Sequence, residues 1–119
     1  MAQLKSTTIN GNLIVTGNVN TTYGADLNSL WNNRLYIFDT NSSESILSTV
    51  NRYGICIYNK YGGSSVPDVP YPDKTVEFQV FVIRYGARKT VIWIKYCDSP
   101  IYIRHIFNSN WITNWIKYH

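Results

Sequence analysis

The sequence predicts a mainly β protein, a small antiparallel β-sheet or sandwich with one short helix, preceded by a short fibrous β segment. From residue 35 onward, apolar runs rich in Ile, Val, Tyr, Phe and Trp alternate with short stretches of Gly, Pro, Asn and Ser, as strands alternate with turns. With 119 residues the chain is long enough for one hydrophobic core and too short for two.

Residues 1–22 make up the predicted fibrous segment, and residues 23–119 make up the predicted compact domain. Between residues 8 and 20, short apolar pieces alternate with the turn signals Asn10-Gly11 and Gly17-Asn18, which indicates strand–turn–strand units. These pieces hold too few apolar side chains to bury one another, because an isolated hairpin is at best marginally stable in water. We therefore expect the segment to associate with copies of itself.

The compact domain is predicted to open with a helix and to continue as strands. Leu27, Leu30 and Trp31 are spaced by three and four residues, which predicts a short helix from residue 25 or 26 to Asn32. Residues 42–48 are short and rich in Ser, and a loop is predicted there. Strands bounded by Gly, Pro, Asn or Ser are predicted over residues 35–39, 53–59, 76–85, 90–97, 101–107 and 111–118.

The longest irregular stretch, residues 60–73, connects two of these strands. Its prolines, Pro67, Pro70 and Pro72, prevent most of its backbone from pairing in a sheet. Loops of this length inside a compact domain tend to be functional or mobile. The stretch is therefore a candidate binding region.

The charge pattern and the lack of a long apolar run argue against two kinds of partner, nucleic acid and the interior of a membrane. The formal charge of +4 comes from basic residues that are scattered, with Arg88-Lys89 as the one adjacent pair, so we expect no nucleic-acid partner. No apolar run is long enough to insert in a membrane.

Cys56 and Cys97 each lie in an apolar run, which is typical of buried thiols. Whether they pair stays open, because the strand register is unknown.

The sequence offers no catalytic constellation, so we expect no enzymatic activity, no cofactor and no metal. The seven acidic residues lie mostly at turns or strand ends, where Asp is a common turn former. Of the two histidines, His119 is the final residue and His105 has no accompanying nucleophile motif.

Aromatic residues indicate a binding surface instead. The chain has ten tyrosines and four tryptophans, residue types that bind ligands at low entropic cost. Strand alternation places Trp111 and Trp115 on one face with Thr113 and Lys117. Two interpretations stay open: this face stacks sugar rings, or the indoles pack beneath a loop or against a subunit. The aromatic residues of the last strands are Trp93, Tyr96, Tyr102, Trp111, Trp115 and Tyr118.

The C-terminal part of the chain resembles a known family. The residues Tyr102-Ile103-Arg104, followed by Trp111-Ile112-Thr113-Asn114-Trp115-Ile116-Lys117, are similar to the ending of the pyocin-knob domain, which terminates many phage tail fibres and R-type pyocin fibres. Residues 25–30, which lead into a strand at 35–38, are similar to the opening of that domain. The chain departs from the family pattern at residues 41–51 and in its proline-rich loop.

Residues 8–17 separately resemble a short repeat of phage tail and baseplate proteins that belongs to a trimeric fibrous shaft. The order of the two resemblances, shaft first and knob last, is the order found in fibres. Together they imply a homotrimeric tail-fibre tip in the virion, made in the host cytoplasm and bound to other tail proteins. It would adhere to a bacterial cell-surface polysaccharide or teichoic acid; the alternative is a purely structural assembly domain without receptor binding.

The resemblance also divides the candidate residues into two groups. It implies a scaffold role for the signature residues, which are Tyr102, Arg104, Trp111 and Trp115. Specificity is then expected in exposed loops and aromatic positions outside the signature. The candidate ligand-binding residues are Tyr61, Asp68, Tyr71, Asp73, Arg84, Arg88 and Trp93.

Overall fold

A computed structural model of the chain describes residues 8–17 and 34–119. Residues 8–17 are exposed and contain no helix or strand, so the strand–turn–strand units predicted there are not formed in the single chain. Their apolar side chains find no cross-strand partner within the segment, and the expected self-association stays a prediction. The other residues of the predicted fibrous segment, and the helix predicted from residue 25 or 26, lie outside the described residues.

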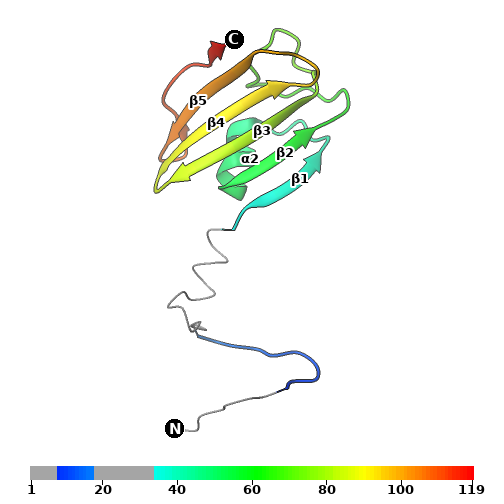
Figure 1. The fold of residues 1–119 in the computed structure, drawn as a ribbon, viewed down its shortest axis with the longest axis vertical. Coiled ribbons are helices and arrows are strands. Elements are labelled where there is room, and N and C mark those ends of the chain that lie inside the picture. Colours follow the sequence, from blue (N-terminus) through cyan, green and yellow to red (C-terminus); the bar gives the residue numbers. More distant parts are fainter. Residues whose placement is uncertain (1–7, 18–33) are drawn as a thin grey trace. The chain divides into compact units, whose positions relative to one another are not determined.

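Residues 34–119 form one seven-stranded sheet with a single short helix, which confirms the mainly β class (Figure 1). The sheet order is β1-β2-β3-β4-β5-β6, and β7 also pairs with β5. The strands are β1 (Tyr36–Thr40), β2 (Cys56–Lys60), β3 (Phe78–Tyr85), β4 (Arg88–Lys95), β5 (Ile101–Phe107), β6 (Asn110–Trp111) and β7 (Ile116–Tyr118).

Helix α2 (Ile46–Tyr53) replaces the predicted loop at 42–48 and the start of the strand predicted at 53–59. Ser45 caps it, because the Ser45 side chain accepts a hydrogen bond from the backbone N–H of Ser48. Ile46, Thr49 and Val50 are buried at helical spacing. The helix ends at Gly54, whose φ of +70° favours glycine.

The first two strands are parallel, which differs from the antiparallel sheet expected from the sequence. Tyr36 lies opposite Cys56, and the register continues to Thr40 opposite Lys60. Parallel neighbours require a crossover connection, and α2 supplies it. All other strand pairs are antiparallel, with Gly86 and Ala87 forming the short turn between β3 and β4.

One face of the sheet carries the hydrophobic core. Its central residues are Tyr58, Val80 and Trp93, which lie opposite one another on β2, β3 and β4 and are almost fully buried. Helix α2 covers this face and lies behind the sheet in Figure 1. From the proline-rich loop, Val66 and Val69 are buried in the same cluster, so much of the loop belongs to the covering layer.

A buried lysine holds the base of this loop. Lys60 is 2% exposed, and its Nζ donates to the carbonyl oxygens of Gly62 at 2.7 Å, Thr75 at 3.2 Å and Val76 at 3.4 Å. Burial lowers the pKa of Lys60. Three carbonyl acceptors compensate for the removal of the ammonium from water and hold the loop's two ends together.

The last predicted strand, 111–118, is interrupted. β6 and β7 pair with opposite ends of β5. Thr113 lies in the break between β6 and β7, and Arg104 lies on β5 between the two paired stretches. Arg104 Nε donates to the Thr113 carbonyl oxygen at 2.7 Å, and the Thr113 hydroxyl accepts from the His105 backbone N–H at 3.0 Å. These bonds satisfy backbone groups that a continuous strand would pair directly.

The two cysteines are free and lie in different environments. Cys56 is 0% exposed, and burial raises the pKa of its thiol to about 11, whereas Cys97 is exposed.

We expect the native protein to react with Ellman's reagent at one thiol, Cys97, and at the second, Cys56, only after unfolding in urea. The Cys97→Ser variant is expected to show no rapid reaction; rapid reaction of that variant would contradict the described burial of Cys56.

Candidate functional site

An open hollow of about 320 Å³ lies between edge strand β1 and helix α2. Its volume is at the lower end of the range of ligand sites. Aromatic rings and polar groups both line it, and its charged residues include an ion pair between Glu44 and Arg52. The lining residues of this β1–α2 hollow are Tyr36, Phe38, Asp39, Thr40, Ser42, Glu44, Thr49, Arg52 and Tyr53.

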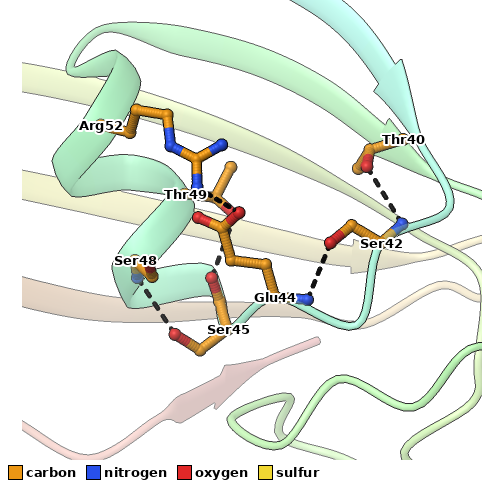
Figure 2. A network of polar contacts seen from close by, with 7 residues as sticks. All are labelled: Thr40, Ser42, Glu44, Ser45, Ser48, Thr49 and Arg52. Atoms are coloured by element: carbon orange, nitrogen blue, oxygen red, sulfur yellow. Dashed lines mark hydrogen bonds and ion pairs between the residues drawn. The ribbon is translucent and has the colours of Figure 1, made fainter.

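Short polar bonds position the segment that enters α2 (Figure 2). The Thr40 hydroxyl accepts from the Ser42 backbone N–H at 3.1 Å, and the Ser42 hydroxyl accepts from the Glu44 backbone N–H at 3.0 Å. Each bond closes a tight local turn of the kind that Ser and Thr favour. The turns direct the Glu44 side chain toward α2, where it meets Arg52 from the last turn of the helix.

Glu44 and Arg52 form the charged part of the hollow. Their Oε2 and guanidinium nitrogen are 2.5 Å apart. The second carboxylate oxygen, Oε1, is buried and has no hydrogen-bond partner among the described residues. Because this oxygen has almost no accessible surface, the ion pair through Oε2 is the contact that compensates for the burial of the carboxylate. The Arg52 side chain is 57% exposed and has donors free to face solvent or a ligand.

Three rings form the apolar part of the hollow. The Tyr53 ring centroid lies 5.1 Å from that of Tyr36 and 4.5 Å from that of Phe38. Phe38 stacks in turn on Tyr58 of the core, with centroids 5.1 Å apart. These contacts fix the rings before any ligand arrives, which lowers the entropic cost of binding.

Rings beside a carboxylate and a guanidinium suit a polyhydroxylated ligand. The rings offer apolar faces to the C–H groups of a sugar, and the charged groups bond its hydroxyls. The other carboxylate at the hollow, Asp39, accepts from the Asn59 amide at 2.8 Å. Asp39 and Glu44 are therefore each bonded to a neighbouring side chain of the domain.

The candidate residues chosen from the sequence do not form one site. Asp68 is structural: its carboxylate accepts from the backbone N–H groups of Ile46 at 2.7 Å and Leu47 at 3.0 Å, and its carbonyl accepts from the Trp115 indole at 2.7 Å. Asp73 accepts from the backbone N–H and hydroxyl of Thr75 within its own turn.

Trp93 is 0% exposed and packs between Phe78, Tyr71 and Tyr102, so its ring is closed to a ligand. Tyr71 is half-buried over this cluster and donates its hydroxyl to Asp98. That bond raises the pKa of Tyr71 to about 12 and lowers the pKa of Asp98. Tyr71 and Trp93 therefore both contribute to packing in this domain.

Tyr61, Arg84 and Arg88 are the candidates that reach solvent. Tyr61 is 51% exposed and lines a second hollow of about 200 Å³ with Asn59, Gln79 and the exposed Tyr96. Arg84 and Arg88 flank the Gly86-Ala87 turn: Arg84 Nε donates to the Gly86 carbonyl at 3.1 Å, and the Arg88 guanidinium lies 5.6 Å from the Phe107 ring centroid. The two regions are lined by separate residues and share none with the β1–α2 hollow.

The four signature residues lie in two adjoining clusters. The Arg104 guanidinium lies 4.2 Å from the Trp111 ring and 5.8 Å from the Trp115 ring, and the two indoles are 5.4 Å apart. Tyr102 packs instead on Trp93. Cation–π contacts and the Trp115 bond to Asp68 join the chain's end to the proline-rich loop.

The residues of the β1–α2 hollow escaped the sequence reading. They come from two separate strand and helix segments, and residues 42–48 were expected to form a loop. One signal was present: Ser45 precedes residues spaced as a buried helical face, which marks a helix start. A helix that continues to residue 53 places Arg52 and Tyr53 in its last turn. From there Arg52 reaches Glu44, which precedes the helix, and Tyr53 reaches the rings of strand β1.

The double hydrogen bond from Asp68 to α2 makes a testable contribution to stability. We expect Asp68→Ala to lower the free energy of unfolding by about 1–2 kcal/mol, because two backbone donors lose their acceptor. Asp73→Ala removes only the two bonds to Thr75 within an exposed turn and is the matched control, with an expected loss of about 0.5 kcal/mol or less. Urea denaturation measures both, and equal losses would contradict the capping role.

The Tyr71–Asp98 bond predicts a dependence of stability on pH. Because the bond lowers the pKa of Asp98, its contribution is present above the unfolded value of about 4 and is lost as the pH falls through the folded value. Wild-type protein is therefore expected to be more stable than Tyr71→Phe near neutral pH, with the gap narrowing toward pH 2. A gap of constant size in urea denaturation across this range would contradict the assignment.

No helix within residues 8–17 and 34–119 is long and apolar enough to cross a membrane, and these ranges hold no group of three potential metal ligands. Comparison with models of protein families, with curated protein sequences and with solved structures finds no match for this chain. Its function is therefore to be inferred from the contacts of the domain itself.

Proposed function

We propose that this chain is the receptor-binding tip of a phage tail fibre or related particle, a homotrimer that adheres to a bacterial surface glycan. The β1–α2 hollow is the observation that carries the proposal, because it combines fixed aromatic rings with an exposed guanidinium that is held by the Glu44 carboxylate. The resemblance to the pyocin-knob ending supplies the biological setting.

A neutral or anionic sugar polymer is the ligand class that fits these groups best. Arg52 can donate to a ring oxygen, a carboxylate or the phosphate of a teichoic acid. The net charge of +4 favours an anionic polymer over a cationic one. Weak binding by one hollow suffices when several copies engage one polymer, because later contacts are intramolecular.

The second candidate is a structural assembly domain that touches no receptor. One observation favours it: the sheet face opposite α2 exposes large apolar side chains, among them Ile37 at 73% and Ile83 at 62%. Exposed apolar area of this kind marks protein contacts. The two candidates differ in the surface that carries the function, so substitutions in the hollow separate them.

Adhesion is tested with the full-length chain on an array of bacterial surface polysaccharides and teichoic acids. For any polymer that binds, we expect Arg52→Ala to weaken binding by about tenfold or more, since a hydrogen bond to a charged group is lost. Arg84→Ala is the comparison, because Arg84 is an exposed arginine outside the hollow, and wild-type binding is expected. Loss of binding in this variant alone would place the glycan at the Gly86-Ala87 turn and overturn the assignment.

Tyr61→Ala, tested on the same array, asks whether the second hollow contributes. Loss of binding in this variant, with Arg52→Ala unaffected, would place the glycan near Tyr61 and overturn the assignment to the β1–α2 hollow. Absence of binding to every polymer, with the fold intact by circular dichroism, would favour the structural candidate.

A further inference from the structure

The face of the sheet opposite α2 carries an apolar row that crosses six strands. The strand register places its members directly opposite one another, each pair on neighbouring strands. Five of the six are isoleucine. The row, called here the isoleucine row, consists of Ile37, Ile57, Phe81, Ile92, Ile103 and Ile116.

Further apolar side chains widen the row on both sides. Ile94 and Ile101 lie opposite each other in the next row, and Ile83 lies beyond the row on the other side. Together with Leu35 they line a wide open hollow of about 420 Å³. No residue of 34–119 forms a layer over this face, whereas α2 and the proline-rich loop cover the opposite one.

This composition is typical of a sheet that is buried on both sides. An antiparallel sheet with one face in water usually alternates apolar and polar residues, whereas here both phases are largely apolar at the centre of β3 to β5. The polar residues on the row's side, which are Gln79, Arg88, Thr90 and His105, lie away from the row itself. Two charged residues, Asp39 and Arg88, share the phase of the row and lie toward its margins, and the other charged strand residues belong to the other phase. Lys89, Lys95, Arg104 and Lys117 lie one residue out of phase with the row and project from the covered side.

We propose that another copy of this chain covers the isoleucine row, so that the uncovered sheet faces of neighbouring subunits pack together. A copy supplies a surface of the same length that is uncharged along the row, so apolar groups meet apolar groups throughout the contact. The chain outside the described residues offers Leu27, Leu30 and Trp31 as its one cluster of large apolar side chains. That cluster is small beside a row that crosses six strands.

The size of the face agrees with a specific contact. Six strands about 4.8 Å apart, apolar over about 20 Å along the strands, give a face on the order of 600 Å². Two such faces bury on the order of 1,200 Å² in total, which is at the lower end of specific stable interfaces. This contact rests on the proposed function for its biological role, since multivalent adhesion requires several subunits that are held together. Its test measures association of the subunits and does not measure adhesion.

The decisive measurement is the mass of the full-length chain in solution by light scattering over a range of concentrations. We expect two or three times 13.8 kDa for the wild type and 13.8 kDa for Ile92→Lys, whose ammonium would be buried without a partner in the contact. Ile14→Lys tests the other possible contact, since Ile14 is 86% exposed in the segment 8–17, whose self-association the sequence predicts. If the isoleucine row carries the contact, this variant keeps the wild-type mass.

A folded state is verified by the near-ultraviolet circular dichroism of the buried Trp93. If Ile92→Lys fails to fold, Ile103→Thr provides the milder change at the neighbouring position of the row, and partial dissociation at low concentration is expected. An oligomer that Ile14→Lys dissociates and Ile92→Lys does not would place the contact in the segment 8–17 and overturn the proposal.

A wild-type monomer also overturns it, and binding of the dye ANS then shows what covers the face. Strong dye binding to that monomer would mean that the row is free, as for a surface that waits for a different protein. Weak binding would mean that the chain's own leading residues cover it. A wild-type monomer would also contradict the homotrimer of the proposed function. Glycan binding by the β1–α2 hollow is measured separately, so failure of this contact is distinguishable from failure of adhesion.

Discussion

Asp68 joins three parts of the chain that are distant in sequence, and the covered side of the sheet depends on it. Its carboxylate holds the first turn of α2 and its carbonyl holds the indole of Trp115, while Val66 and Val69 beside it enter the core. A proline-rich loop has few backbone hydrogen bonds of its own, so these contacts and the buried Lys60 fix its position. Through them a loop becomes a layer of the core.

The strands were predictable because their chemistry is local. Ile, Val and aromatic residues between turn formers indicate strands wherever they occur, and the strand Ile101–Phe107 was predicted with its observed bounds. The parallel pairing of β1 with β2 was not predictable, because it depends on a crossover whose helix is short and rich in Ser. The helical spacing of Ile46, Thr49 and Val50 was present, but it competes with the turn preference of the serines around it.

The candidate site was less predictable from the sequence than the strands were. Asp68 and Trp93 have the chemistry of ligand-binding residues, yet one satisfies helix donors and the other fills the core. Their roles follow from long-range contacts that residue type alone does not specify. The β1–α2 hollow was missed for the complementary reason, since Glu44 and Arg52 become a pair only when the predicted loop is a helix. The proposed ligand site and the isoleucine row have no residue in common, so one subunit can use both.

The turn at Gly86 and Ala87 has a consequence for how the domain folds. It joins β3 to β4 through two residues, with Gly86 at a φ of +59°, so the longest strand pair closes over a very short stretch of chain. β2 reaches β3 only across residues 61–77, and closing that longer loop costs more chain entropy. The β3–β4–β5 meander is therefore suited to form first and to serve as the template on which the parallel pair and the proline-rich layer assemble.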